Sequence, residues 1–158
     1  MKKIIVNEEW CLGCHLCEYE CAFANSVTKL RNETNDIAKL LKGKTIYPNI
    51  KIEDGTEDGK KINFAVSCRH CDYPYCAKSC INGCLTVLSD GTVKYDKDKC
   101  VGCYTCVVAC PYGCILPNEG NTVRKCELCL NNQVGKPACV KHCPNAAIVY
   151  EEVEESKV

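Results

Sequence analysis

Residues 100–111 read CVGCYTCVVACP, and the spacing of the four cysteines in this run guides the interpretation of the whole chain. The gaps between them are two, two and three residues, and a proline follows the last cysteine. This is the run that ligates a [4Fe–4S] cluster in bacterial ferredoxins. The first three thiolates bind one cluster, and the fourth, one helical turn further on, reaches a second cluster. The stretch therefore predicts a cysteine group shared between two clusters.

Three other groups end in the same three-residue gap. Residues 11–21 keep the full spacing but lack the proline, whereas the middle gap grows to four residues in 68–80 and to nine in 126–143. Four groups with one closing spacing form a specific iron–sulfur signal. Together the groups contain sixteen of the eighteen cysteines: Cys11, Cys14, Cys17, Cys21, Cys68, Cys71, Cys76, Cys80, Cys100, Cys103, Cys106, Cys110, Cys126, Cys129, Cys139 and Cys143.

Zinc and disulfide bonds are the alternatives for a chain this rich in cysteine. Zinc ribbons also use pairs of cysteines two residues apart, but they separate two pairs by a longer loop and do not need a third cysteine so close. Disulfides require an oxidising compartment. The chain begins MKKIIVNEEWC, which contains no apolar run typical of a signal peptide. We therefore expect a cytoplasmic, reduced protein, unless it is exported together with a signal-bearing partner.

Composition limits the remaining classes of function. Two Phe, one Trp and one Met are few large side chains for 158 residues, so we expect a bound group to replace part of the core. The formal net charge is zero, which argues against a nucleic-acid binder that depends on phosphate attraction. No apolar segment is long enough to span a membrane.

Several short strands and helices are predicted between the cysteine groups. A three-residue gap places two cysteines one helical turn apart, so each group is expected to lie on or open a short helix. Asp90-Gly91 is typical of a hairpin turn. The strands expected are 2–6, a hairpin over 44–67 with Gly55 and Gly59 in its loop, a hairpin over 85–95 and a closing strand over 146–150. A helix is predicted over 26–42 and a charged, solvated tail over 151–158.

The order of the groups and the four-residue gap in CRHCDYPYC resemble the four-cluster, ferredoxin-like subunits of the DMSO reductase and formate dehydrogenase type. The stretch CLGCHLCEYECAFANS and the small size are most similar to soluble partners of carbon monoxide dehydrogenase and of tungsten aldehyde oxidoreductases. The resemblance implies an α+β fold of two ferredoxin-like βαββαβ modules, each with two clusters, and with hairpin insertions. It places the outer module at 1–25 plus 120–150, an insertion at 26–67 and the inner module at 68–119.

The resemblance also implies four [4Fe–4S] clusters and their ligands. Two cysteine groups exchange their fourth ligand within each module. The implied sets are Cys68, Cys71, Cys76 and Cys110; Cys100, Cys103, Cys106 and Cys80; Cys11, Cys14, Cys17 and Cys143; and Cys126, Cys129, Cys139 and Cys21. Two features depart from the family pattern: Ile81 follows Cys80 where proline is common, and the nine-residue gap is short.

A row of such clusters moves single electrons. The resemblance implies an electron-transfer subunit, not itself an enzyme, that relays electrons between a catalytic oxidoreductase subunit and a second redox protein. The alternative is a scaffold or assembly protein that organises or polymerises such a complex, so self-association is possible. A freely diffusing ferredoxin is a third reading, which the long cysteine-free segment 22–67 disfavours because it suggests a docking surface.

A few residues remain outside the ligand sets. Cys84 and Cys114 each lie four residues after a fourth ligand, and they are either small buried core residues, S–H donors that shift a cluster potential, or spare ligands. His15, His70 and His142 are expected to be polar residues near the cluster surface rather than proton carriers. Trp10 is expected to shield a cluster or pack locally. Basic residues near the fourth group are expected to be ordinary surface charges rather than a steering patch: Arg124, Lys125, Lys136 and Lys141.

Overall fold

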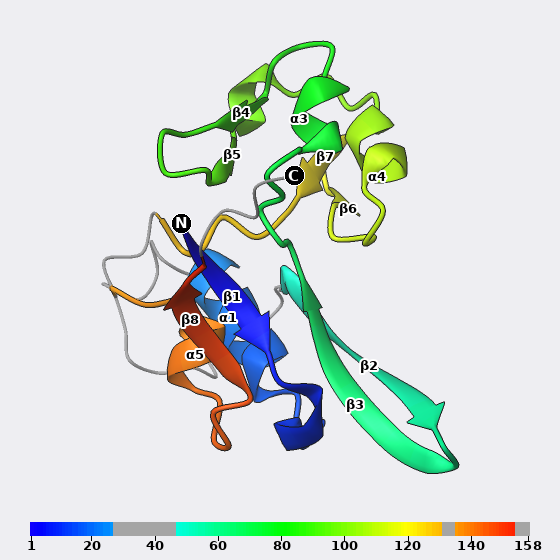
Figure 1. Cartoon of the computed structure of the whole chain (residues 1–158). Helices are drawn as coiled ribbons and strands as arrows, with labels where there is room; N and C mark the ends of the chain where they lie inside the picture. Colours follow the sequence, from blue (N-terminus) through cyan, green and yellow to red (C-terminus); the bar gives the residue numbers. More distant parts are fainter. Residues whose placement is uncertain (27–46, 131–134, 154–158) are drawn as a thin grey trace, which may run out of the picture.

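The computed structural model describes residues 1–26, 47–130 and 135–153. Short helices and pairs of consecutive strands make up the described chain between its first and last strands (Figure 1). In chain order they are β1 (Lys2–Val6), the 3-10 helix η1 (Glu8–Trp10), α1 (Leu16–Ser26), β2 (Ile50–Glu57), β3 (Lys60–Ser67), α3 (Tyr75–Lys78), β4 (Leu85–Val87), β5 (Val93–Tyr95), the 3-10 helix η2 (Lys97–Lys99), α4 (Thr105–Ala109), β6 (Leu116–Asn118), β7 (Thr122–Arg124), α5 (Ala138–Lys141) and β8 (Ile148–Glu152). The mixture agrees with the predicted α+β class.

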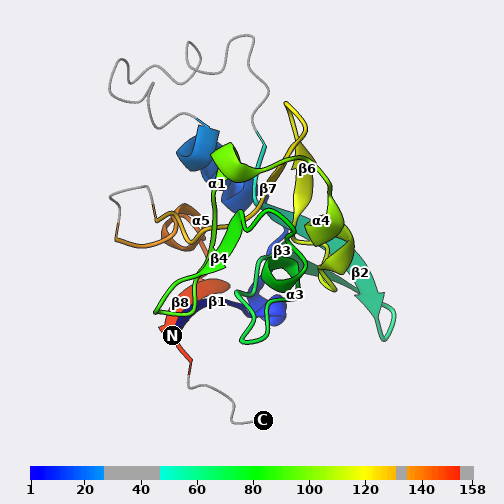
Figure 2. The ribbon, with the colours of Figure 1, turned by 90° about the horizontal axis from the view of Figure 1, so that it is seen from above.

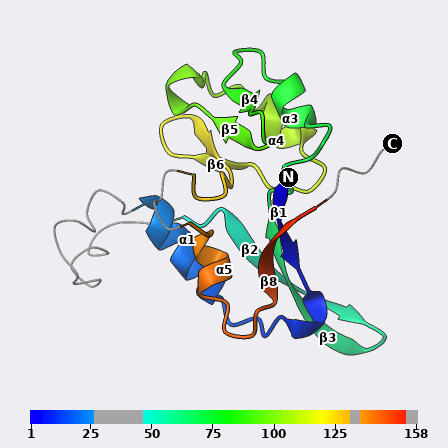
Figure 3. The same ribbon diagram turned by 60° about the vertical axis from the view of Figure 1, so that its left-hand side comes forward.

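The elements gather at two ends of the molecule. Helices α3 and α4 and strands β4 to β7 form one lobe, and β1, β8, α1 and α5 form the other (Figure 1). Strand β1 pairs antiparallel with β8, with Ile4 opposite Tyr150, so the two ends of the described chain share a sheet. Helices α1 and α5 pack side by side beside this sheet (Figure 3).

The hairpin β2–β3 forms a long arm that packs against the lobe of α1 and α5 at its base (Figure 2). Its strands pair from Ile50 opposite Ser67 to Glu57 opposite Lys60. The base of the arm is fixed to α1, because the backbone N–H of Ile52 donates to Oε1 of Glu18 at 2.6 Å. The predicted hairpin is therefore confirmed, but Gly55 lies inside β2 and not in the loop.

Two smaller hairpins build the other lobe. Strands β4 and β5 pair around the predicted Asp90-Gly91 turn, where Oδ1 of Asp90 accepts a hydrogen bond from the N–H of Thr92 at 2.9 Å. Strands β6 and β7 form a hairpin that was not predicted. Pro117 lies in the middle of β6, and proline within a short run is a signal against a strand. This hairpin spans residue 120, where a module boundary was expected.

The closing strand begins later than predicted. Ala146 has a φ of 50°, in the left-handed region, so β8 starts at Ile148 and continues to Glu152. Glu151 and Glu152, predicted to begin the charged tail, instead pair with Lys3 and Lys2 of β1. The helix predicted over 26–42 lies outside the described residues, apart from Ser26 at the end of α1. In the described part of the chain, no helix combines the length and apolar character needed to cross a membrane.

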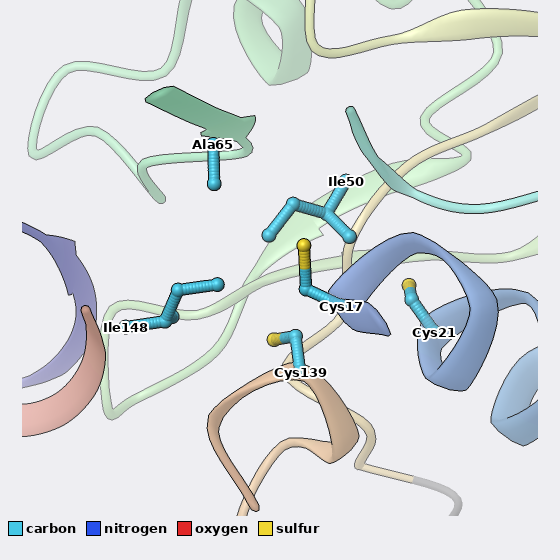
Figure 4. Close-up of a cluster of buried hydrophobic side chains, with 6 residues drawn as sticks. All are labelled: Cys17, Cys21, Ile50, Ala65, Cys139 and Ile148. Carbon is cyan, nitrogen blue, oxygen red and sulfur yellow. The ribbon is translucent and has the colours of Figure 1, made fainter. Parts of the chain in front are cut away.

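Each lobe has a small core in which cysteines take the place of larger apolar side chains. In the lobe of α1 and α5, three of the six buried core residues are cysteines, and they lie among Ile50, Ala65 and Ile148 (Figure 4). The core of the other lobe contains Cys84 and Cys106 beside four aliphatic residues: Leu85, Val93, Ile115 and Val123. Cysteine side chains thus make up part of both cores, as the scarcity of large aromatic residues predicts.

Candidate iron–sulfur centres

Each cysteine group lies on a short helix, as its spacing predicts. Cys17 and Cys21 are one turn apart on α1, Cys76 is on α3 with Cys80 just beyond its end, and Cys106 is on α4 with Cys110 as its C-cap. In the fourth group, Cys139 is on α5 and Cys143 follows its end. The last two cysteines of every group are thus about one helical turn apart.

The loops before the helices use left-handed backbone conformations. In the first group Gly13 and His15 have φ values of 62° and 60°, and in the third group Gly102 and Tyr104 have 69° and 55°. The other two groups show the same feature at His70, Leu128 and Cys129. Alternating left-handed and right-handed residues turn successive N–H groups inward and form a concave site for an anion, as at many iron–sulfur centres. The loops therefore suit a negatively charged cluster.

For three of the four predicted ligand sets, the four cysteines of the set line one hollow, and each set has its own hollow. The first hollow is bounded by one set together with Trp10, Leu12 and Ile148, and the other two lie in the opposite lobe. The cysteines of the three hollows are Cys11, Cys14, Cys17 and Cys143; Cys80, Cys100, Cys103 and Cys106, with Cys84; and Cys68, Cys71, Cys76 and Cys110, with Cys114. Each hollow thus combines three cysteines of one group with the fourth cysteine of another.

The fourth set is the most buried. Burial raises the pKa of the Cys139 thiol above its ordinary range, and the neighbouring Cys126, Cys21 and Cys129 thiolates raise it further. These four cysteines therefore lie close together between α1, α5 and the loop 125–130. The charge of Cys68, in the opposite lobe, is among the lesser causes that raise the pKa of Cys126.

The chemistry of these donors fits iron. Burial raises the pKa of Cys17 and of Cys126 to about 12, so a thiolate at either position needs a cation to offset its charge. Iron supplies that charge when a cluster is bound. Among the described residues, no three His, Cys, Asp or Glu side chains come close enough to hold a single metal ion.

Backbone N–H groups already point at several of the sulfurs. The N–H of Asn49 donates to Sγ of Cys21 at 3.2 Å, and the N–H of Leu128 donates to Sγ of Cys126 at 3.4 Å. In the other lobe the N–H of Cys114 donates to Sγ of Cys110 at 3.4 Å. Such bonds stabilise charge on sulfur and raise the reduction potential of a cluster.

The two extra cysteines are buried core residues. Cys84 and Cys114 are 4% and 7% exposed, and each precedes a buried aliphatic residue, Leu85 or Ile115. Both follow a turn in which Gly83 or Gly113 donates its N–H to the carbonyl of the preceding fourth ligand at 3.2 Å. The third turn of this kind, after Cys143, has Ala147 at the matching position, 1% exposed and followed by the buried Ile148. A small residue is thus what the position requires.

The two extra cysteines differ in their hydrogen bonds. Sγ of Cys114 donates to the backbone carbonyl of Ser67 at 3.1 Å. Sγ of Cys84 lies 3.2 Å from Sγ of Cys80, within reach of an S–H···S contact. Burial raises the pKa of both thiols. A side-chain hydrogen bond with Cys80 raises the pKa of Cys84 further, and one with Cys110 does the same for Cys114. Each extra thiol thus lies beside the fourth ligand that precedes it.

The three histidines and Trp10, which lie in or beside the cysteine groups, differ in their exposure and contacts. Nδ1 of His15 lies 2.7 Å from Oε2 of Glu18 on the surface, and Nδ1 of His142 lies 3.4 Å from Oε2 of Glu20. His70, which was expected near the cluster surface, is 1% exposed. Trp10 is 53% exposed and lines the hollow of the first set, as expected of a residue that packs locally.

The expectation that Lys125 is an ordinary surface charge is wrong. Lys125 is 3% exposed, and its ammonium donates to the backbone carbonyls of Val93 and Cys126 at 2.6 and 2.5 Å. Its neighbour Arg124 donates to the carbonyl of Pro48 and lies over the ring of Tyr47. Both basic residues hold segments together, so they are not free to steer a partner.

Comparison with known proteins assigns the class. Residues 60–153 match the family described as "4Fe-4S dicluster domain", and the chain belongs to this family. It is thus an iron–sulfur protein of the electron-transport class.

Individual relatives refine this assignment. The chain is 33% identical over 162 residues to electron transport protein HydN of Escherichia coli K12, a match that covers 92% of this chain and 85% of HydN. It is 35% identical over 153 residues to the putative oxidoreductase AegA of the same organism, covering 92% of this chain but only 21% of AegA. It is also 30% identical over 167 residues to a formate dehydrogenase iron–sulfur subunit of Haemophilus influenzae, covering 98% of this chain and 52% of that subunit.

These relatives confirm the resemblance to iron–sulfur subunits of the DMSO reductase and formate dehydrogenase type. The narrower resemblance to partners of carbon monoxide dehydrogenase stays a prediction.

Proposed function

We propose that this chain holds four [4Fe–4S] clusters and relays single electrons through them between a catalytic oxidoreductase subunit and a second redox protein. The observation that carries the proposal is the arrangement of the cysteines into sets of four that each draw on two groups. The ligand sets proposed are those of the sequence analysis. We also propose that groups two and three belong to one ferredoxin-like module and groups one and four to the other.

The four sets follow one another along the molecule. Helix α1 carries Cys17 and Cys21, which belong to two adjoining sets, and α4 with its C-cap carries Cys106 and Cys110 in the same way. In the proposed path the set of Cys126 adjoins the set of Cys68, whose charge is among those that raise the pKa of Cys126. The proposed path therefore has two inner sets and two end sets.

The two ends of the path reach the surface. Cys14 in one end set and Cys103 in the other are exposed, whereas Cys21, Cys126 and Cys139 of an inner set are buried. Exposure at both ends suits a relay that receives an electron from one partner and passes it to another. A cluster supplies the one-electron chemistry when bound, and the chain contributes the thiolates, the N–H groups that face them and the apolar walls that exclude water.

The partner belongs to the class that the relatives suggest. Formate dehydrogenase and DMSO reductase subunits appear in the names of relatives, and the sequence resemblance points to carbon monoxide dehydrogenase and aldehyde oxidoreductases. We propose a catalytic subunit of this kind, in which the substrate is transformed, with this chain as the non-catalytic carrier.

Deletion of the chain from its host tests the relay. We expect the coupled reaction with the physiological acceptor to be lost, while the catalytic partner still reduces an artificial dye. Anaerobically purified protein should contain iron and sulfide for four clusters and should lose visible absorption on reduction with dithionite. Physiological coupling that survives deletion refutes the relay. Clusters that do not change oxidation state within the physiological range favour the scaffold alternative.

A further inference from the structure

The lobe of α3 and α4 and the loop that leads to the fourth cysteine group meet at a buried cation. Lys125 is 3% exposed, and no carboxylate of the described residues lies within ion-pair distance of its ammonium. Its partners are two backbone carbonyls, those of Val93 and Cys126. A charged lysine is almost never fully buried without an opposite charge, because desolvation is costly. An anion close to Lys125 would offset the cost of burying its charge.

The ammonium lies between the two inner ligand sets. One of its carbonyl partners belongs to Cys126, a member of the most buried set. The other belongs to Val93, which forms part of the wall of the hollow that Cys68, Cys71, Cys76 and Cys110 line. The ammonium of Lys125 thus contacts a member of one inner set and a residue that lines the hollow of the other.

The neighbouring histidine shows that this core holds one cation and not two. The N–H of Val93 donates to Nδ1 of His70 at 3.0 Å. A nitrogen that accepts a hydrogen bond carries no proton, so His70 is neutral and its proton is on Nε2. Nε2 is buried and has no protein partner among the described residues. An unpaired donor in the same core is a second sign that the space is arranged around an acceptor.

Burial of Cys21, Cys126 and Cys139 in one inner set creates a need for such a charge. Reduction adds an electron to a cluster, and a surrounding of low polarity disfavours the extra negative charge. A cluster held by these buried cysteines would then be reduced less readily, which would hinder the passage of an electron through it. A fixed positive charge beside both inner sets offsets this effect.

We propose that Lys125 is the internal counter-ion of the two inner clusters and raises their reduction potentials. The inference rests on the ligand sets of the proposed function. Lys125 is buried and takes part in no bond-making step, so it is a positioning residue that acts through charge.

The test is a potentiometric titration of the whole chain with electron paramagnetic resonance detection. In Lys125→Met, two of the four potentials should fall, so that the ratio of oxidised to reduced cluster at a fixed potential rises about tenfold, which is about 59 mV for one electron. Lys125→Arg keeps the charge and should keep the wild-type potentials. Lys94→Met is the matched control, because it removes the same charge from an exposed residue that follows Val93 in β5. It should change the ratio less than about twofold.

Each outcome decides between charge and packing. Four unshifted potentials in Lys125→Met, or an equal shift of all four, overturn the proposal. If Lys125→Met fails to load clusters, Lys125→Gln and Lys125→Arg separate the causes. A requirement for charge is supported if the arginine variant loads its clusters with wild-type potentials and the glutamine variant does not. The proposal is overturned if the glutamine variant shows unshifted potentials, or if the arginine variant fails to load clusters. A wild-type chain that lacks four reducible clusters instead refutes the proposed function.

Discussion

Replacement of Cys84 and Cys114 by alanine tests the division of the eighteen cysteines into sixteen ligands and two core residues. Both side chains lie in hollows that also contain four predicted ligands, so proximity alone does not exclude them as ligands. The turn after Cys143 provides the internal precedent, because Ala147 occupies the same place there. We expect the double variant to bind the same amount of iron and sulfide as the wild-type chain.

The cost in stability follows from the contacts that each thiol makes. Removal of one buried sulfur resembles removal of one methyl group and costs about 1 kcal/mol. Cys114 also gives up its contact with the carbonyl of Ser67, which adds roughly 0.5 kcal/mol because a thiol is a weak donor. For a chain of this size, the temperature at which the clusters are lost should fall by about 2–4 °C for each kcal/mol.

The assay is a count of iron and sulfide per chain, followed by thermal loss of visible absorption at one fixed scan rate. Cys84→Ser and Cys114→Ser keep a donor at each place and serve as matched variants. Cys80→Ser removes a predicted ligand and is the positive control for cluster loss. Loss of about a quarter of the iron in Cys84→Ala or Cys114→Ala would show that the ligand sets are assigned wrongly.

Three further predictions follow from the backbone and the cores. Gly102→Ala should abolish loading of its cluster and lower the free energy of unfolding by more than about 3 kcal/mol, because the φ of Gly102 is 69° and a Cβ there would lie 2.3 Å from the carbonyl oxygen of Asn121. Gly113→Ala is the matched control, because Gly113 has a similar φ of 61° but a Cβ there would meet no atom within 4 Å. This variant should lose about 1–2 kcal/mol of unfolding free energy and keep its iron. Ile115→Ala should lower the free energy of unfolding by about 2–5 kcal/mol, since the side chain is 1% exposed, whereas Ile81→Ala, at 76% exposed, should change it by less than about 0.5 kcal/mol in denaturant titrations. Removal of iron by a chelator should abolish most helical circular dichroism at the same temperature, because the cores are built around thiols that metal binding holds in place; a chelated chain that keeps its native spectrum would contradict this coupling.

Local signals in the sequence predicted most elements correctly. The three-residue gap requires a helical turn wherever it occurs, and a short helix is present at each of the four places. Asp90-Gly91 predicted a turn because these residues adopt turn conformations at little cost, and β4 and β5 pair around it. The hairpin β6–β7 was missed, although Gly120 and Asn121 adopt the left-handed conformation that its turn needs. Pro117 weakened that signal.

The buried polar residues could not be predicted from local patterns. Lys125 follows an arginine and precedes a cysteine group, a context that is typical of a surface. Its burial depends on the carbonyl of Val93, which is 32 residues away in the sequence. His70 likewise depends on the N–H of Val93, 23 residues away. One backbone unit of β5 thus fixes both side chains, and only the folded chain brings the three together.

This arrangement also explains why β5 ends a short hairpin rather than a longer sheet. The N–H of Val93 binds His70 and its carbonyl binds Lys125, so neither group is free to pair with a further strand. The N–H of Tyr95 is likewise taken by Oε1 of Glu127 at 2.6 Å. Side chains from the loops that carry cysteine groups two and four therefore complete the hydrogen bonds of β5. The edge of the hairpin becomes the joint between the two inner ligand sets, and its geometry depends on a lysine that no carboxylate among the described residues neutralises.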